Sequence, residues 1–263
     1  MRRLITIPMS HYCEKARWAL DRLGLRYVEE RHLQVFHYPR TYWFSRGPTV
    51  PVLIDNEVTL ADSSAILKFL DQYAAAGREL YPVEPSLRAE VQNWERLFDD
   101  ELGVESRRWV YFHMLPHPLR GLRTAGDRVP WFELLLAPFC YPAIRWFIAR
   151  KLDVRAETVE RGMARCWQII AKTDACLADG RRYLVGDRLS AADISLACML
   201  APFVLPPQYG SRLPTLDMLP APMRADLCAV RGTATGQFVM RLFERERHTS
   251  ACARIASPGR PCV

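Results

Sequence analysis

One stretch, residues 49–73, constrains the fold more than any other part of this sequence; it reads TVPVLIDNEVTLADSSAILKFLDQY. Two short β-prone runs, 52–54 and 58–60, flank three polar residues that favour a tight hairpin turn. Apolar residues then recur at helical spacing, so a helix is expected to begin near Ser63. The stretch therefore predicts a β-hairpin that leads directly into a helix.

Asp62 and Ser63 stand at the first turn of that expected helix. The free N–H groups and the positive dipole end of a helix favour a ligand carboxylate at this place. Asp62 contributes the opposite charge, which suits a ligand ammonium. The pair is thus a candidate binding site for the ammonium and carboxylate of an α-amino acid group. The alternative is that either residue only caps its own helix, which is a common role for Asp and Ser.

The residues before this stretch predict a small α/β unit. Residues 4–7 and 26–30 read as strands, and residues 13–23 between them read as a helix. A helix between two strands implies a right-handed parallel crossover. Residues 32–47 show no clean period and are interpreted as a loop with a short irregular helix. The charges at 14, 15 and 17 alternate in sign, so they are interpreted as facing solvent.

The second part of the chain is expected to be all-helical. Gly and Pro residues in 77–85 indicate a linker, which predicts domains at 1–76 and 86–263. The most apolar segment, 131–149, is interpreted as a buried helix, because its two prolines, Glu133 and Arg145 disfavour a membrane span.

The helical part also contains a helix-capping motif and a C-terminal tail. Ser190 and Asp193 form an acidic variant of a capping box at a later helix. Residues 249–263 read as a loose tail.

Composition narrows the classes of function. The 263 residues carry a net charge of +7 that is spread along the chain, which a solvated face or an anionic small ligand explains at least as well as nucleic acid. The sequence has no interleaved basic and aromatic patch of the kind that binds nucleic acid, so no such partner is expected. The eight cysteines form no CxxC pair and no zinc-type cluster, so no metal site is expected. Unpaired cysteines in apolar patterns, with no apolar segment typical of a signal peptide, predict a reducing, cytoplasmic location.

Ser10 and Cys13 are rival catalytic candidates. Ser10 lies between the first expected strand and the first expected helix. Its hydroxyl is therefore placed to stabilise a ligand thiolate beside the free N–H groups at the start of that helix. It is equally placed to be only the helix N-cap. Cys13 lies inside the first helical turn, where a cysteine is either an activated nucleophile or a small core residue.

Two further residues before the hairpin are candidates for ligand binding. A cis peptide bond between Val50 and Pro51 would turn the backbone of Val50 outward, where it can pair with a bound peptide like an added strand. The alternative is an ordinary trans proline at the start of an edge strand. Arg46, in the loop before Val50, is a candidate partner for a second ligand carboxylate.

These residues occur in an order that resembles the cytosolic glutathione S-transferase family. The resemblance covers nearly the whole chain and rests on four stretches: SHYCEKARWAL (10–20), TVPVLID (49–55), LADSSAILKFLD (60–71) and YLVGDRLSAADISLA (183–197). It implies an α/β thioredoxin-like N-terminal domain followed by an all-α C-terminal domain. The Ser-x-x-Cys pattern at 10–13 looks like the serine-type classes of the family.

The resemblance also implies roles for these residues. Ser10 would stabilise the thiolate of glutathione, and Val50, before a cis Pro51, would pair with its cysteinyl backbone. Asp62 and Ser63 would hold the γ-glutamyl ammonium and carboxylate. The implied reaction is attack of the thiolate on a hydrophobic electrophile, in a detoxifying enzyme that is a homodimer with no membrane span and no nucleic-acid partner.

Three positions depart from the family pattern. Asp62 stands where the family usually has Glu, Pro48 stands where some classes have a polar contact, and Ser64 replaces an arginine of other members. The helical part is also longer than usual, around 116–151 and at the tail. Two alternatives therefore stay open: a glutathione-dependent thiol transferase or reductase that uses Cys13, and a non-catalytic ligand-binding or interaction protein of the same fold.

Overall fold

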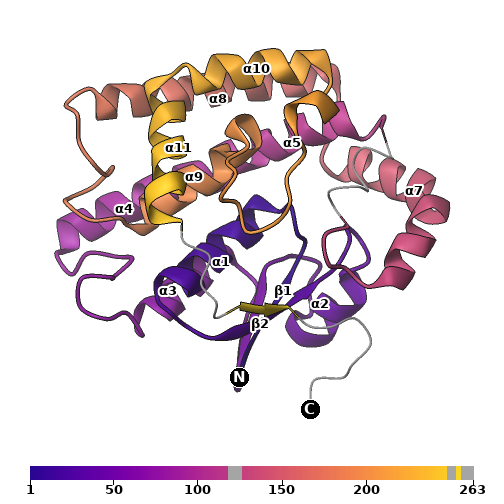
Figure 1. Ribbon diagram of the computed structural model, residues 1–263, viewed down its shortest axis with the longest axis horizontal. Coiled ribbons are helices and arrows are strands. Elements are labelled where there is room, and N and C mark those ends of the chain that lie inside the picture. Colours follow the sequence, from indigo (N-terminus) through magenta and orange to yellow (C-terminus); the bar gives the residue numbers. More distant parts are fainter. Residues whose placement is uncertain (118–125, 248–252, 256–263) are drawn as a thin grey trace.

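The computed structural model describes residues 1–117, 126–247 and 253–255 (Figure 1). A β-sheet with its helices forms one part of the molecule, and a larger group of helices forms the other. This is the expected fold class, an α/β thioredoxin-like N-terminal part followed by a helical C-terminal part.

The sheet contains five strands in the order β4-β3-β1-β2-β5. Strands β1 and β2 are parallel, as the crossover rule predicts, and β3 pairs with β1 and β4 in antiparallel fashion. Asn56 adopts a φ of 53° in the β3–β4 turn, the left-handed conformation that asparagine tolerates. The strands are β1 Arg2–Thr6, β2 Tyr27–Arg31, β3 Val52–Asp55, β4 Val58–Leu60 and β5 Ala253–Ile255.

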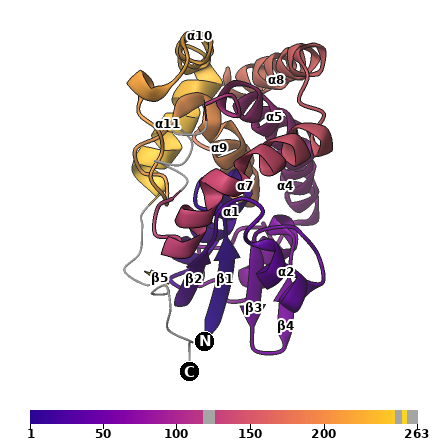
Figure 2. The ribbon, with the colours of Figure 1, turned by 90° about the vertical axis from the view of Figure 1, so that its right-hand side faces the viewer.

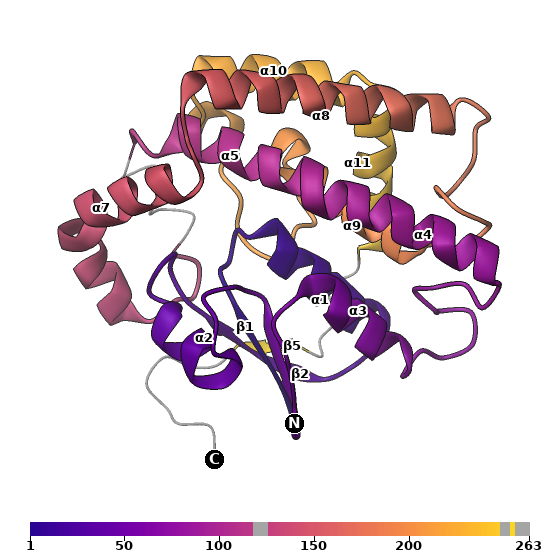
Figure 3. The same cartoon turned by 180° about the vertical axis from the view of Figure 1, so that it is seen from behind.

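Three helices accompany the strands. Helix α1, His11–Arg22, joins β1 to β2, and α3, Ser63–Asp71, follows the hairpin. Both lie between the sheet and the helical part of the molecule (Figure 3). Helix α2, Tyr38–Ser45, is the short helix expected within 32–47. Leu4, Leu53 and Ile66 are at most 1% exposed and belong to the same apolar core.

The helical part is built around α9, in which every residue except Pro202 is buried. Helix α4 continues through a π-helical turn, η1, into α5, so that the three form one long rod (Figure 3). The elements are α4 Pro85–Leu97, η1 Phe98–Leu102, α5 Gly103–Met114, α7 Trp131–Lys151, α8 Ala156–Leu177, α9 Ala191–Val204, η2 Leu216–Met218, α10 Ala221–Arg231 and α11 Ala234–Glu246.

The capping box at the start of α9 is present as predicted. The Asp193 carboxylate accepts hydrogen bonds from the backbone N–H of Ser190 at 2.9 Å and of Leu184 at 2.8 Å. Because Asp193 is fully buried, these bonds satisfy a carboxylate that would otherwise be costly. The box fixes the point at which the central helix begins.

Three expectations are corrected by the structure. Glu14, Lys15 and Arg17 do not face solvent: all three are at most 1% exposed, because α1 is enclosed by the sheet and by the helical part. Helix α7 is not a buried helix, since most of its large apolar side chains are exposed. The tail is not entirely loose, because β5 adds to the edge of the sheet beside β2.

Helix α7 is the one described helix that is long and apolar enough, by length and composition alone, to cross a membrane. No group of three His, Cys, Asp or Glu residues in the described ranges is arranged to hold a metal ion.

Candidate functional site

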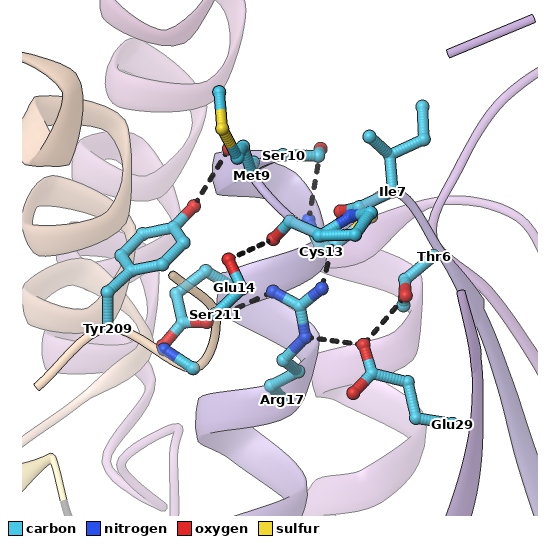
Figure 4. A network of polar contacts seen from close by, with 12 residues as sticks. Thr6, Ile7, Met9, Ser10, Cys13, Glu14, Arg17, Glu29, Tyr209 and Ser211 are labelled. Carbon is cyan, nitrogen blue, oxygen red and sulfur yellow. Dashed lines mark hydrogen bonds and ion pairs between the residues drawn. The ribbon is translucent and has the colours of Figure 1, made fainter. Parts of the chain in front are cut away.

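Ser10 is the N-cap of α1 and lies at the end of the loop that follows β1 (Figure 4). Its hydroxyl oxygen accepts a hydrogen bond from the backbone N–H of Cys13 at 3.4 Å, and its own N–H donates to the carbonyl of Ile7 at 3.1 Å. The hydroxyl is only half-buried. The capping role considered for Ser10 is therefore present, and the hydroxyl proton remains available to a ligand.

The loop from Ile7 to Ser10 is fixed by side chains from both parts of the molecule (Figure 4). Arg17 of α1 donates to the carbonyl of Ile7 at 3.3 Å. Tyr209 donates to the carbonyl of Met9 at 3.1 Å, and Ser211 donates to the carbonyl of Pro8 at 2.6 Å. The helical part thus helps to position the loop that carries Ser10.

Arg17 also organises a buried ion network behind this loop (Figure 4). It donates to Glu29 of β2 at 2.6 Å and to Glu14 at 3.1 Å, and Thr6 donates to Glu29 at 2.7 Å. Burial alone would raise the pKa of Glu29, but the Arg17 and Arg31 guanidinium groups lower it. Glu29 therefore stays ionised and paired.

Ser10 opens into a cavity of about 470 Å³ between the sheet-bearing part and the helical part, here called the interdomain cavity. Its walls are mainly apolar and aromatic, a composition typical of small-molecule sites. Val50 and Pro48 line it from the N-terminal part. From the helical part come side chains of α5, α7 and α9, among them Val110, Ile148 and Ala201.

The charges in the wall of the interdomain cavity are all positive. Arg107 of α5 and Lys151 of α7 line it, and none of the described lining residues is Asp or Glu. The Arg107 Nε atom is buried without a hydrogen-bond partner in the described ranges, and its guanidinium lies 5.7 Å from the centre of the Tyr12 ring. A half-buried guanidinium without a carboxylate partner in the described ranges favours an anion in this cavity.

His11 and Tyr12 also line the cavity, and both are neutral near pH 7. Burial, with a contribution from Arg107, lowers the pKa of His11 to about 3, and its Nε2 lies 3.0 Å from the carbonyl of Gly103. Burial raises the pKa of Tyr12, whose hydroxyl donates to the carbonyl of Asp99 at 2.7 Å. Neither residue supplies a charge to the site.

Cys13 is fully buried, on the side of α1 that faces the core. Burial is the main cause that raises the pKa of its thiol, and it outweighs the opposite effects of Arg17 and Ser10. A thiol that is both inaccessible and held in its neutral form is poorly suited to act as a nucleophile. This environment favours the core role that the sequence left open for Cys13.

Asp62, Ser63 and Ser64 line a different cavity of about 390 Å³, here called the α3–α4 cleft. Tyr12 lines both cavities, so the two adjoin at α1. Asp62 is exposed and its Oδ1 caps α3 by accepting from Ala65 N–H at 2.7 Å, whereas Ser63 is 4% exposed. The capping alternative for Asp62 is thus realised through one carboxylate oxygen, and the second oxygen takes no part in the cap.

The sequence reasoning did not find the buried polar cluster behind the α3–α4 cleft. The Lys15 ammonium lies 2.8 Å from Ser64 Oγ, 2.5 Å from Asp99 and 2.9 Å from Glu95. Ser64 in turn donates to Asp99 at 2.6 Å. Ser64, which departs from the family pattern, therefore joins α1 and α3 to η1. The sequence did not reveal this cluster, because the mixed charges of Glu14, Lys15 and Arg17 resemble those of a solvated helix face.

The remaining candidates, Val50 and Arg46, differ in their relation to the interdomain cavity: Val50 lines it and Arg46 does not. The Val50–Pro51 peptide bond is cis, as expected from the resemblance. Arg46 ends α2, is exposed, and lines neither cavity. The structure thus brings Ser10 and Val50 to one cavity, places Asp62 and Ser63 in the adjoining cleft, and leaves Arg46 outside both. No pattern in the sequence pointed to Arg107.

Two family models match the chain. "Glutathione S-transferase, N-terminal domain" matches residues 4–78, and "Glutathione S-transferase, C-terminal domain" matches residues 156–225. The two ranges together cover more than half of the chain, which therefore belongs to the glutathione S-transferase family. Helices α4, α5 and α7 fall between the matched ranges. No curated protein matches the sequence.

Solved structures agree in fold at low sequence identity. A glutathione S-transferase from Methylobacterium radiotolerans in complex with glutathione sulfonate is 19% identical with a TM-score of 0.59, covering 100% of this chain and 99% of its own. A theta-class enzyme from Xanthomonas axonopodis pv. citri with glutathione bound is 20% identical with a TM-score of 0.56, covering 95% and 98%. Ure2p in complex with glutathione is 15% identical with a TM-score of 0.59, covering 93% and 94%.

Proposed function

We propose that this protein is a glutathione transferase in which Ser10 stabilises the thiolate of bound glutathione. In this proposal residues 1–76 bind glutathione and residues 86–263 supply most of the electrophile pocket. The family resemblance further implies a cytoplasmic homodimer that serves detoxification.

The observation that carries the proposal is the opening of the Ser10 hydroxyl into the apolar interdomain cavity. The hydroxyl stands at the N-terminus of a 12-residue helix, where free N–H groups favour an anion. Arg107, without a hydrogen-bond partner in the described ranges, adds positive charge to the same cavity. A thiolate is the anion that this arrangement and this family suit best.

The rest of glutathione would extend from this point in two directions. Its cysteinyl backbone would pair with Val50, which lines the same cavity. The γ-glutamyl group would enter the α3–α4 cleft, with its ammonium at Asp62 and its carboxylate at Ser63 and the N-terminus of α3. Arg46 is assigned no contact in the present arrangement, because it lines neither cavity.

The chemistry that follows is nucleophilic substitution or addition. The thiol of glutathione gives its proton to water, and the thiolate sulfur attacks an electrophilic carbon. In a substitution the leaving group departs with the electron pair of the broken bond; in an addition the electrophile keeps the electron pair of its broken π bond and takes up a proton from water. Ser10 donates its hydroxyl hydrogen to the sulfur and forms no covalent bond. The apolar walls of the interdomain cavity would hold a hydrophobic electrophile.

The first experiment is calorimetric titration of glutathione into the wild type and into the double variant Asp62→Ala/Ser63→Ala. Titration to about 10 mM detects a site as weak as about −4 kcal/mol. Binding by the wild type that the double variant loses supports the glutathione site. Absence of any binding to the wild type would refute the proposal.

The second experiment tests Ser10 with an activated aryl halide as electrophile. Ser10→Ala is expected to lower the rate at neutral pH at least about ten-fold. Ser10→Thr, which keeps the hydroxyl and the cap, is the matched control, because loss of the cap alone costs about 1 kcal/mol of stability. Binding of glutathione without turnover of any electrophile would instead support the alternative of a ligand-binding protein.

A further inference from the structure

Helix α7 runs along the outside of the molecule (Figure 2). Several of its side chains line the interdomain cavity. A single stripe of the helix, repeating every three or four residues, turns inward. Its members are buried or half-buried and comprise Glu133, Ala137, Tyr141, Ile144 and Ile148. Two residues of this stripe connect the helix to the rest of the molecule: Glu133 lies 2.6 Å from His32 Nδ1, and Tyr141 donates to the carbonyl of Leu115 at 2.5 Å.

The opposite side of α7 is apolar and uncovered. We call it the α7 outer face and define it by six side chains with their exposed fractions: Trp131 67%, Phe132 47%, Leu135 59%, Leu136 47%, Phe139 80% and Trp146 66%. A surface helix normally turns its apolar stripe inward and its polar residues outward. Here both sides are apolar, so the outer face needs a second apolar surface to cover it.

The exposed charged side chains of α7 all have one sign. Arg145 and Arg150 are exposed and form no hydrogen bond or ion pair within the described ranges, and Lys151 is exposed at the end of the helix. The sole acid of the helix, Glu133, is 1% exposed and belongs to the inner stripe. Solvated helices usually carry both signs of charge, so this pattern indicates an anionic partner.

Helix α2 extends the same side of the molecule (Figure 2). Its Trp43 is 80% exposed and its Tyr42 is 52% exposed. The two helices contact one another, since the Tyr38 and Phe147 ring centres are 6.2 Å apart and Lys151 Nζ lies 3.3 Å from the Tyr38 hydroxyl. The contact places α2, which carries two exposed aromatic residues, next to α7.

We propose that the α7 outer face binds the surface of an anionic phospholipid bilayer. Exposed Trp, Phe and Leu side chains beside unpaired arginines form the combination that enters the headgroup region of such a bilayer. A second copy of this chain fits less well, because a twofold pairing of like faces would add the arginines of one copy to those of the other, and the outer face offers no acid to pair with them.

The helix lies on the bilayer and does not cross it. Its inner stripe is occupied by contacts with the rest of the molecule, including the buried Glu133. In this position α7 is the wall between the lipid surface and the interdomain cavity, so an apolar molecule dissolved in the bilayer lies within one helix diameter of the cavity. The proposal rests on this surface alone and stands whether or not the protein conjugates glutathione.

The test is co-sedimentation of the full chain with vesicles. Phosphatidylcholine vesicles are compared with vesicles of phosphatidylcholine mixed with phosphatidylglycerol, each at low and high salt. The protein is expected to sediment with the anionic vesicles and to be partly released by salt, with a blue shift of tryptophan fluorescence. A protein that stays in the supernatant with both kinds of vesicle would overturn the proposal.

Two variants test the apolar and the charged parts of the surface. Trp131→Ser/Phe139→Ser/Trp146→Ser is expected to lower the partition coefficient about 100-fold. Its matched control, Trp167→Ser/Tyr73→Ser, removes exposed aromatic residues of α8 and of the segment after α3 and should leave the coefficient unchanged. Arg150→Gln is expected to lower it about five-fold at low salt, and Arg150→Lys should restore it.

Two outcomes would contradict the assignment directly. Equal sedimentation of the wild type and the triple variant would show that another surface binds lipid. A wild-type dimer, seen by light scattering without vesicles, that the triple variant converts to a monomer would assign the α7 outer face to a second copy of the chain. Neither outcome affects the titration of glutathione. The membrane proposal and the proposed function are therefore tested independently, and either can be refuted without the other.

Discussion

Ser10 and Cys13 are joined by a hydrogen bond yet occupy opposite environments. The Ser10 hydroxyl is half-buried at the edge of the interdomain cavity, whereas the Cys13 thiol is fully enclosed and has a raised pKa because of burial. Their shared bond, from Cys13 N–H to Ser10 Oγ, uses the backbone of one and the side chain of the other. The Cys13 side chain can therefore be changed without removing the bond.

Cys13→Ala is expected to leave the rate of glutathione conjugation within about two-fold of the wild type, since the thiol has no access to the cavity. The loss of a buried sulfur should lower the free energy of unfolding by about 1 kcal/mol. Steady-state kinetics and urea unfolding measure the two quantities. A loss of activity with unchanged stability would favour the thiol transferase or reductase that uses Cys13.

Arg107 should act on the ionisation of bound glutathione. Removing its charge in Arg107→Met is expected to raise the pKa of the bound thiol by about one unit, and so to lower the rate at neutral pH about ten-fold but less in alkaline solution. The pH–rate profile measures the shift. Arg108→Met is the control, because Arg108 instead donates to the carbonyl of Leu152 at 2.8 Å and lies outside the cavity wall.

For single residues, the sequence predicted which residues begin helices better than it predicted the environment of each side chain. Ser10 and Asp62 were found because they stand at the starts of helices, and both are caps in the structure. Arg107 was not found, since one arginine in a helix that also carries Arg108 shows no pattern. Its importance arises only because the cavity wall offers it no carboxylate.

At the scale of elements, α7 is held to the N-terminal part by a short set of contacts. Glu133 accepts a hydrogen bond from Leu33 N–H at 2.7 Å and pairs with His32, which also pairs with Glu30 at 3.1 Å. Burial alone would lower the pKa of His32, but the bonds and charges of Glu133 and Glu30 outweigh it and raise the pKa to about 9. The contacts of Glu133 with His32 and Leu33, here called the α7 tether, are therefore stronger when His32 is protonated.

The strength of this tether should depend on pH. A histidine whose pKa is raised from 6.5 to about 9 on folding contributes its stability fully below about pH 6.5 and loses it as the pH rises through about 9. Glu133→Gln is expected to cost about 2 kcal/mol below about pH 6.5 and much less above about pH 9. Urea unfolding at a series of pH values, with hydrogen exchange of residues 131–151, measures the difference.

Glu160→Gln on α8 is the matched control for this change, since Glu160 is exposed and forms no ion pair within the described ranges. It should leave the pH dependence as in the wild type. A cost of Glu133→Gln that stays constant across the pH range would show that the ionisation of His32 does not hold α7.

Elements with strong local signals were predicted well. The hairpin β3–β4 has its turn at Asn56, and α3 begins at Ser63 as expected. The exposure of α7 was not predicted. A run of apolar residues predicts a buried helix, and the sequence alone does not distinguish a helix in the core from an apolar helix on the surface. The strand β5 was missed, since a three-residue strand at the edge of a sheet has too short a pattern to detect.

At the scale of the whole molecule, the two parts are joined through α1. Lys15 lies 2.9 Å from Glu95 of α4, and Arg247, beyond α11, lies 2.7 Å from Glu14 and 2.8 Å from Asp21. All these groups are buried, so their charges are stabilised only while the two parts stay together. The sequence could not show this, because buried ion pairs and solvated ones have the same alternation of charge.

The chain should therefore unfold in one transition, although its two parts match separate family models. Wild-type urea curves followed by tryptophan fluorescence and by far-ultraviolet circular dichroism are expected to coincide. Lys15→Met leaves Asp99 and Glu95 buried without their cation, and should lower the free energy of unfolding by about 3–5 kcal/mol while the two curves stay coincident.

Lys68→Met, at an exposed lysine of α3, is the control for this change and should stay within about 0.5 kcal/mol of the wild type. Separated curves in the wild type would show that the ion pairs at α1 do not couple the two parts. Separation in Lys15→Met alone would show that Lys15 is the main connection, and that Arg247 cannot hold α1 to the helical part without it.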